Sequence, residues 1–183
     1  MSPSQVRAEM TLFSPGLNEN DIAYCIMGAE MAGKLPSVTL KAIGIIRNEI
    51  REAVPLDSRD WGKIVSEIVI DSSLAEALDG LEEFSHIVVL YWMHRAASGE
   101  VPLKIHPRGN RELPLMGLFA TRAPNRPNRI GETTVRLLQR QGNILRVKGL
   151  DALDGTPVID IKPYIPGYDS VDKAEVPQWI KNQ

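Results

Sequence analysis

The hydrophobic positions along the chain follow the spacing of strands more often than that of helices. Residues 38–47 carry β-branched side chains at strand density, and residues 64–70 read as a second strand. Residues 84–93 are almost continuously apolar, which predicts a central strand buried on both faces. The polar segment 48–60 contains a proline and is expected to form a loop between the first two strands.

The second half of the chain predicts a hairpin and further short strands. Residues 133–138 and 144–150 flank the turn-forming pair Gly142-Asn143, which indicates that the two segments pair with each other. Further strands are expected at residues 101–105, 115–121 and 157–162.

One short helix interrupts the strands. Ser73 is expected to cap its first turn, with Glu76 completing the capping box and Gly80 ending or weakening the helix. Because so few helices cannot cover a parallel sheet, a doubly wound fold is disfavoured. The pattern therefore predicts a mainly all-β fold, a small closed antiparallel β-barrel with one short helix.

We expect the barrel domain to span residues 38–168. Residues 1–37 read as an irregular N-terminal extension, in which residues 21–31 could form a helix. Residues 169–183 are expected to form a C-terminal tail.

Composition narrows the class of protein. The chain has 183 residues, enough for a hydrophobic core, and its apolar fraction of 43% is ordinary for a globular protein. No apolar run is long enough to span a bilayer, and the N-terminus lacks the pattern of a secretory signal. Since Cys25 is the single cysteine, no intrachain disulfide can form. These features predict a cytoplasmic protein without a membrane anchor.

Charge is distributed unevenly although the formal net charge is only -2. Between Arg108 and Lys148 there are nine basic residues and two acidic ones. Such a local cationic surface suits a polyanionic partner. A solvated strand face explains the charge run equally well, so both interpretations remain open.

A stiff polar loop lies at the centre of this basic stretch. Pro124 and Pro127 restrict the backbone of residues 119–131, which lowers the entropic cost of holding polar groups in place. Arginines in the loop can grip phosphates or stack on bases, and its asparagines both donate and accept hydrogen bonds. A rigid surface loop without function is the alternative.

Two carboxylates stand at a second turn. Asp151 and Asp154 precede the turn Gly155-Thr156-Pro157. Asp and Gly are common turn residues, so the segment could be purely structural. The functional alternative is that its carboxylates and carbonyls receive a ribose, an amine or a cationic sulfonium.

The three histidines do not predict a metal site. His86 and His94 share a parity on one expected strand, but eight residues of strand place them ~26 Å apart. That separation is too large for one ion, and His106 lies elsewhere in the chain. We therefore expect no bound metal.

Five motifs together resemble one family. They read Ile-Gly-Ile-Ile-Arg at 43–47, Gly-Leu-Glu-Glu-Phe-Ser-His at 80–86, Gly-x-Phe-Ala-Thr-Arg-x-x-x-Arg-Pro-Asn-x-Ile-Gly at 117–131, Asp-x-x-Asp-Gly-Thr-Pro at 151–157 and Asp-Ile-Lys-Pro-Tyr at 160–164. These motifs resemble the TrmO family, also called TsaA-like, YaeB or VirR, of tRNA adenosine N6-methyltransferases. The resemblance covers roughly residues 40–166.

The resemblance implies a dimeric β-barrel enzyme that uses S-adenosyl-L-methionine. Such enzymes methylate N6 of a threonylcarbamoylated adenosine beside the tRNA anticodon. The residues at matching cofactor-binding positions are His94, Arg95, Arg122, Glu132, Asp151, Ala152, Leu153 and Asp154. The expected tRNA contacts are Asn125, Arg126, Arg129, Lys162 and Tyr164. Asn128 or Asp154 is expected to accept a hydrogen bond from an N–H of the adenine amine, which would help the amine turn toward the methyl group.

The chain departs from the family pattern at three places. The family's Pro-Arg-Gln loop is replaced by residues 54–62, where Trp61 could stack on an adenine instead. Arg129 replaces a proline, and Glu132 stands where an apolar residue is usual.

Two other functions stay open: methylation of another RNA or a small molecule, and RNA binding without catalysis.

Overall fold

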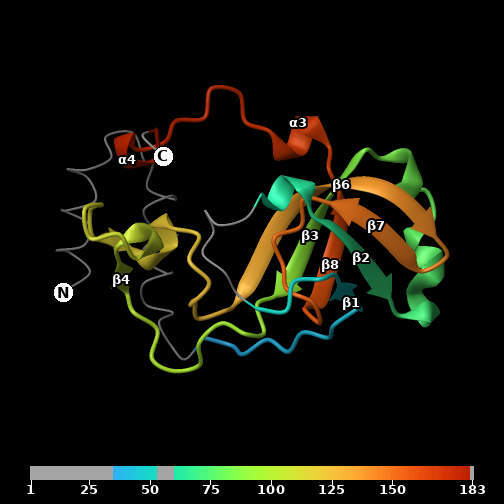
Figure 1. Ribbon diagram of the computed structural model, residues 1–183, viewed down its shortest axis with the longest axis horizontal. Helices are drawn as coiled ribbons and strands as arrows, with labels where there is room; N and C mark the ends of the chain where they lie inside the picture. Colours follow the sequence, from blue (N-terminus) through green and yellow to red (C-terminus); the bar gives the residue numbers. More distant parts are fainter. Residues whose placement is uncertain (1–34, 53–59, 182–183) are drawn as a thin grey trace, which may run out of the picture. The chain divides into compact units, whose positions relative to one another are not determined.

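Six antiparallel strands form a closed barrel in the computed structural model, which describes residues 35–52 and 60–181 (Figure 1). Their order around the barrel is β1-β2-β7-β6-β3-β8, so the first and last strands pair and close it. The strands are β1 (Gly44–Arg47), β2 (Val65–Ile70), β3 (His86–Trp92), β6 (Ile130–Gln141), β7 (Ile144–Lys148) and β8 (Pro157–Pro163). The predicted antiparallel barrel is thereby confirmed.

The chain divides into two compact units, residues 1–39 and 40–183. All barrel strands belong to the second unit. Only residues 35–39 of the first unit are described, so the helix expected at residues 21–31 lies outside the described residues. The proposed division at residues 37, 168 and 183 remains a prediction.

Strand β3 carries the apolar run that predicted a buried strand. Ile87, Val88 and Val89 are all buried, so both faces of the strand are covered in its middle. Its neighbours β6 and β8 both run antiparallel to it, with Val135 and Pro163 flanking Ile87. Because β8 runs opposite to β3, the residues just before β8 lie near the C-terminal end of β3.

The β6–β7 hairpin is also confirmed, although β6 is longer than expected. It begins at Ile130 and ends at Gln141, so its first two residues belong to the polar segment 119–131, which we call the Pro-Asn loop. The turn has Gly142 at φ 60, a left-handed conformation that glycine adopts without strain.

Several boundaries differ from the prediction. Residues 38–43 are not strand, because the ladder to β2 and β8 begins only at Gly44, and Val38 and Leu40 are exposed. The segments expected at 101–105 and 115–121 form only a two-stranded sheet of β4 (Lys104–Ile105) and β5 (Met116–Gly117), separate from the barrel. β-branched composition identifies extended chain but does not reveal whether a partner strand is available.

The helix after β2 is a 3-10 helix, Ser72–Leu78, and its predicted cap was wrong. Asp71, not Ser73, is the N-cap: the Asp71 carboxylate accepts hydrogen bonds from the backbone N–H and the hydroxyl of Ser73. Two short α-helices, α3 (Pro166–Asp169) and α4 (Gln178–Lys181), follow the barrel strands.

Candidate functional site

The sequence-predicted cofactor residues meet at one end of the barrel, where β1 and β3 end and β8 begins. There the backbone N–H of Gly155 donates to the Ile46 carbonyl over 2.8 Å, and that of Met93 donates to the Arg129 carbonyl over 2.8 Å. The segments 46–51, 93–95, 129–133 and 151–156 are thus brought together, and we call this end of the barrel the mouth. The predicted cofactor residues on these segments are far apart in sequence, so only the closed barrel can assemble them.

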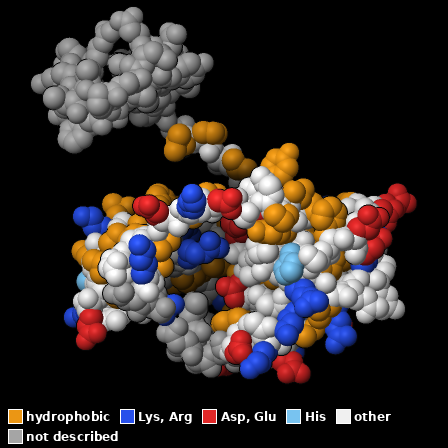
Figure 2. Space-filling view, turned by 90° about the horizontal axis from the view of Figure 1, so that it is seen from above, with side chains coloured by type: hydrophobic (Ala, Val, Ile, Leu, Met, Phe, Trp, Pro, Cys, Tyr) orange, Lys and Arg blue, Asp and Glu red, His pale blue; other side chains and the backbone are white. Residues whose placement is uncertain are grey.

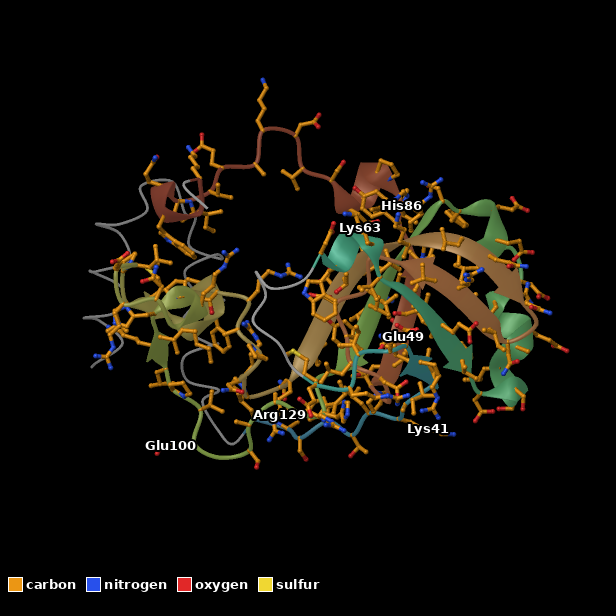
Figure 3. All side chains as sticks on the ribbon, in the orientation of Figure 1. Lys41, Glu49, Lys63, His86, Glu100 and Arg129 are labelled. Atoms are coloured by element: carbon orange, nitrogen blue, oxygen red, sulfur yellow. The ribbon has the colours of Figure 1, made fainter. Side chains whose placement is uncertain are left out.

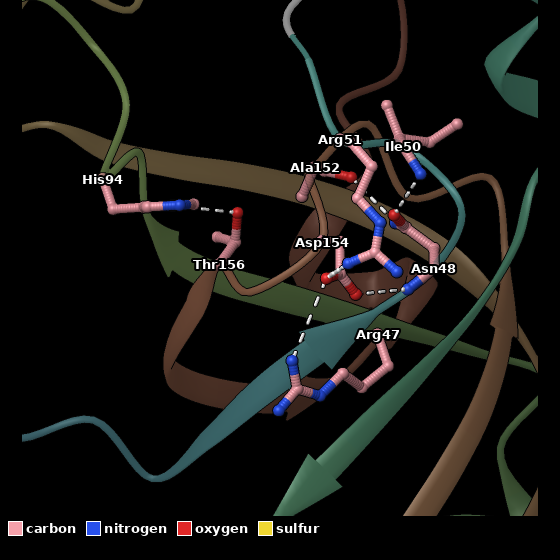
Figure 4. Close-up of polar contacts among 8 residues, drawn as sticks. All are labelled: Arg47, Asn48, Ile50, Arg51, His94, Ala152, Asp154 and Thr156. Atoms are coloured by element: carbon pink, nitrogen blue, oxygen red, sulfur yellow. Dashed lines mark hydrogen bonds and ion pairs between the residues drawn. The ribbon is translucent and has the colours of Figure 1, made fainter.

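Asp154 lies at the centre of a polar network in the mouth (Figure 4). Its side chain is 10% exposed, and one carboxylate oxygen accepts from the backbone N–H of Asn48 over 3.1 Å. The other oxygen pairs closely with the Arg51 guanidinium and lies 3.9 Å from that of Arg47. The carboxylate is therefore already engaged, which suits holding the turn in position better than accepting a substrate proton.

Asn48 uses all its side-chain hydrogen-bonding groups except one acceptor site. Its amide nitrogen donates to the Ser66 hydroxyl (3.0 Å) and to the Ala152 carbonyl (2.9 Å), while its amide oxygen accepts from the Ile50 backbone N–H (2.9 Å). Ser66 is only 1% exposed and Ala152 4%. Asn48 consequently joins the end of β1, the start of β2 and the Asp151–Asp154 segment. The sequence analysis did not identify Asn48 and Arg51. The only signal for them in the sequence is that polar residues directly follow a strand.

A second network anchors Asp151. Its carboxylate accepts from the Tyr91 hydroxyl over 2.9 Å and also contacts the Thr133 hydroxyl. Burial, followed by the charge of Asp151, raises the pKa of the Tyr91 phenol, which therefore stays a hydrogen-bond donor at neutral pH. Tyr91 and Thr133 also escaped sequence prediction, because Tyr91 sits within an apolar run and looked like an ordinary core residue.

His94 follows β3 and faces the residue just before β8. Its Nδ1 lies 3.2 Å from the hydroxyl of Thr156, which is 2% exposed. Burial, followed by repulsion from Arg95, lowers the pKa of the His94 imidazole below its usual 6.5. A neutral imidazole at physiological pH can accept or donate a hydrogen bond without adding positive charge beside a cationic ligand.

The three arginines of the Pro-Asn loop donate to backbone carbonyls, and the contact of Arg122 joins the loop to the mouth. Arg122 donates to the Glu132 carbonyl (2.9 Å), Arg126 to the Thr121 carbonyl (2.8 Å) and Arg129 to the Ala96 carbonyl (3.2 Å). The Asn125 side chain accepts from the Ala97 backbone N–H over 3.1 Å. Within residues 35–52 and 60–181, no hydrogen bond engages the side chain of Asn128, so its amide is available to a ligand.

Lys162 and Tyr164 do not join the other predicted tRNA contacts. Tyr164 packs edge-on against His86, with ring centroids 6.4 Å apart, and Lys162 forms a 2.7 Å ion pair with Asp160. His86 begins β3 whereas Arg129 lies beyond the end of β3, and Figure 3 shows the two residues well apart. A shallow hollow of about 450 Å³, lined by His86, Thr134, Tyr164 and Asp169, occupies that other region.

The basic stretch does not form a single patch. Arg140 forms ion pairs with Asp79 and Glu82, so it ties β6 to the helical segment that precedes β3. Arg146 lies beside Glu67 on the neighbouring strand, and Figure 2 shows basic and acidic side chains interspersed on the face in view. Arg122, Arg126 and Arg129 of the Pro-Asn loop differ from these two arginines, because their side chains donate to backbone carbonyls rather than to carboxylates.

The histidines occupy three separate environments. His106 Nδ1 contacts the Leu113 carbonyl over 2.8 Å, away from His86 and His94. In the part of the chain that the structure describes, no group of three or more His, Cys, Asp or Glu side chains could hold a metal ion. Nor does any described helix have the length and apolarity needed to cross a membrane.

Trp61, predicted to replace the missing Pro-Arg-Gln contact, begins the 3-10 helix Trp61–Lys63. Residues 53–59 of that loop lie outside the described residues. Its stacking role stays a prediction.

Known proteins are similar to this chain in sequence and in fold. A Methanothermobacter thermautotrophicus protein described as a probable S-adenosyl-L-methionine-binding protein is 47% identical over 136 residues, 73% of this chain and 95% of that protein. A mouse protein named tRNA (adenine(37)-N6)-methyltransferase is 42% identical over 103 residues, 55% of this chain and 23% of that protein. A crystal structure of TrmO from Pseudomonas aeruginosa superposes with a TM-score of 0.63 at 35% identity, covering 78% of this chain and 62% of that one.

The chain spans less than two thirds of the length of some relatives, for example 37% of an Archaeoglobus fulgidus protein described as a probable S-adenosyl-L-methionine-binding protein. The tRNA-methyltransferase O N-terminal domain model matches residues 47–170, a span that contains all of the mouth except Ile46. Because the family model matches most of the chain and the fold superposes on that of TrmO, the chain belongs to the tRNA-methyltransferase O family.

Proposed function

We propose that this chain is an S-adenosyl-L-methionine-dependent methyltransferase that modifies tRNA at N6 of a threonylcarbamoylated adenosine next to the anticodon. The observation that carries the proposal is the family match over residues 47–170, which includes nearly every residue of the mouth. The names of the archaeal and mouse relatives support cofactor and substrate respectively. A tRNA substrate also fits a cytoplasmic location.

The polar and charged groups of the mouth fit the chemical groups of S-adenosyl-L-methionine. The Asp151 carboxylate oxygen that Tyr91 and Thr133 do not contact, together with the backbone of Ala152 and Leu153, supplies acceptors suited to a ribose, an amine or a sulfonium. His94 adds a polar group without charge. Arg122, anchored on the Glu132 carbonyl, supplies a cation for the carboxylate of the amino-acid part. Arg95 lies beside His94. When bound, S-adenosyl-L-methionine would supply a methyl group on a positively charged sulfur: the nitrogen lone pair would attack the methyl carbon, the carbon–sulfur bond would break, and S-adenosylhomocysteine would leave as the neutral thioether.

The protein's task is mainly alignment, since the methyl donor is intrinsically activated. The adenine amine must turn its lone pair out of conjugation, and an acceptor for its N–H favours that orientation. We assign this role to the Asn128 side-chain oxygen, because the Asp154 carboxylate is occupied by Asn48, Arg51 and Arg47. Asp154 then acts as a positioning residue, and the amine proton leaves to solvent after methyl transfer.

Recognition of tRNA is assigned to the Pro-Asn loop. Asn125, Arg126 and Arg129 lie on one stiff segment whose arginines are held by backbone carbonyls rather than by carboxylates. Lys162 and Tyr164 would contact RNA only if it extends to the His86 region.

Titration calorimetry tests the cofactor assignment. Wild-type protein should bind S-adenosyl-L-methionine, and Arg122→Ala should weaken binding by about 1–3 kcal/mol if it removes a charged hydrogen bond. Arg136→Ala, an exposed arginine further along β6, is the matched control and should bind as wild type does. Absence of binding by the wild type would overturn the proposal.

A homodimer is a further part of the proposal, carried by the family resemblance. Light scattering at micromolar concentration should give twice the chain mass of 20.3 kDa. A mass of one chain would contradict the homodimer.

A non-catalytic RNA-binding barrel is the alternative function, and it would bind tRNA without binding the cofactor.

A further inference from the structure

Phe119 presents an aromatic ring to solvent from a fixed backbone. Its side chain is 77% exposed, whereas that of the adjacent Leu118 is 4% exposed. The 3-10 helix Leu118–Ala120 is held by a 2.9 Å hydrogen bond from the Leu118 N–H to the Leu103 carbonyl and by one from the Thr121 N–H to the Leu118 carbonyl. The ring is therefore pre-positioned rather than carried on a loose loop.

Arg126 covers part of this ring. Its guanidinium carbon lies 5.5 Å from the ring centroid, within the range of a cation–π contact. The same guanidinium donates to the Thr121 carbonyl over 2.8 Å, which fixes its position. The ring and the cation form one unit, which we call the Phe119–Arg126 platform, with ring surface left open to solvent.

The charge around the platform distinguishes a nucleic acid from a protein surface as the partner. Residues 113–131 contain three arginines and no acidic residue. Their hydrogen bonds go to backbone carbonyls, and among residues 35–52 and 60–181 none of the three forms an ion pair with a carboxylate. An exposed aromatic ring within uncompensated positive charge matches a ligand with both flat bases and phosphates.

We propose that the Phe119–Arg126 platform stacks on an unpaired base of the RNA substrate, so that Phe119 is a positioning residue for the tRNA. This inference rests on the proposed tRNA methyltransferase function. Stacking holds a splayed nucleotide without reading its sequence, since every base has a π-face. Arg126 adds electrostatic attraction to the same nucleotide, while Arg129 remains available for the backbone.

The test compares tRNA binding by Phe119→Leu, Phe119→Trp and wild type across a salt series, using filter binding of tRNA that contains the threonylcarbamoylated adenosine. Phe119→Leu should bind about 5- to 100-fold more weakly, and its salt dependence should equal that of the wild type, because a stack releases no counterions. Phe119→Trp should bind at least as well as wild type. Leu115→Ala, which removes another exposed apolar side chain, should leave binding unchanged.

Two results would overturn the inference. Wild-type affinity in Phe119→Leu would show that no base stacks there. Weaker binding accompanied by a lower mass in light scattering would show that the ring contacts a second copy of the chain. Methylation of tRNA by the wild type separates this failure from that of the proposed function. If the wild type methylates tRNA and Phe119→Leu binds tRNA normally, only the platform is refuted. If the wild type binds no tRNA, both the platform and the proposed function are refuted.

Discussion

The backbone N–H of Asn48 donates a 3.1 Å hydrogen bond to the carboxylate of Asp154, although 106 residues separate the two in the chain. The Asn48 side chain simultaneously reaches the Ala152 carbonyl and the buried Ser66 hydroxyl. This single residue thus joins the first strand's end to the segment that is expected to hold the cofactor. Its position suggests that cofactor affinity and barrel stability depend on the same contacts.

Asn48→Ala should lower the free energy of unfolding by about 1–3 kcal/mol, because it leaves the buried Ser66 hydroxyl and Ala152 carbonyl without a partner. It should also weaken binding of S-adenosyl-L-methionine. Urea denaturation and calorimetry measure the two effects. Asn110→Ala, which loses only an exposed turn contact to the Glu112 N–H, is the control and should change stability less. Equal effects of the two variants would mean that the Asn48 network is not a positioning element.

Gly131→Ala tests how tightly the Tyr91–Asp151 network is packed. A Cβ at this position would lie 2.3 Å from the Tyr91 ring, so the ring and its hydroxyl must move away from Asp151. Overpacking of this kind destabilises by about 1–3 kcal/mol. Thermal unfolding should therefore show a lower midpoint for this variant.

The control is Gly117→Ala, since nothing lies within 4 Å of a Cβ there and the backbone φ is −58. It should unfold close to wild type. A Gly131→Ala variant as stable as Gly117→Ala would contradict the packing of Tyr91 against β6.

The sequence predicted the barrel well because its central strands carry their own signals. The run 84–93 and the turn at Gly142 depend on local residue types, and both were found as expected. The first strand and the segments at 101–105 and 115–121 were overextended, because strand ends depend on where partner strands stop.

The candidate site was predictable only in part. His94, Arg122 and the 151–154 segment could be named from motifs, and the fold brings them to one mouth. Asn48, Arg51 and Tyr91 could not, because their roles arise from contacts across the closed barrel. Lys162 and Tyr164 were named from the motif at 160–164, but they lie at and just beyond the C-terminal end of β8, whereas the mouth lies where β8 begins.

The imidazole of His94 should titrate below its ordinary pKa of 6.5. Because the folded state binds this proton less readily than the unfolded state, the contribution of His94 to stability is intact above pH 6.5 and declines as the pH falls below it. Proton NMR of the imidazole C–H signals measures the midpoint directly. Arg95→Gln should raise it, although not fully, since burial is the larger cause. A midpoint at or above 6.5 in the wild type would contradict the burial of His94 beside Thr156.

Arg140→Ala should destabilise the barrel because Arg140 links the β6–β7 hairpin to Asp79 and Glu82 and donates to the Ala75 and Gly142 carbonyls. Its cofactor affinity should stay at the wild-type level, since these contacts lie outside the mouth. Arg136→Ala on the same strand serves as the exposed control. If Arg140→Ala weakened tRNA or cofactor binding without loss of stability, the residue would belong to a binding surface instead.

Methyl transfer to tRNA tests the central claim most directly. tRNA containing the threonylcarbamoylated adenosine is incubated with the protein and S-adenosyl-L-methionine bearing an isotopically labelled methyl group, and its nucleosides are then analysed by mass spectrometry. We predict one labelled methyl group on that adenosine, and its loss or strong reduction in Asn128→Ala at unchanged cofactor affinity. Binding of the cofactor with no label in any tRNA nucleoside would contradict the account.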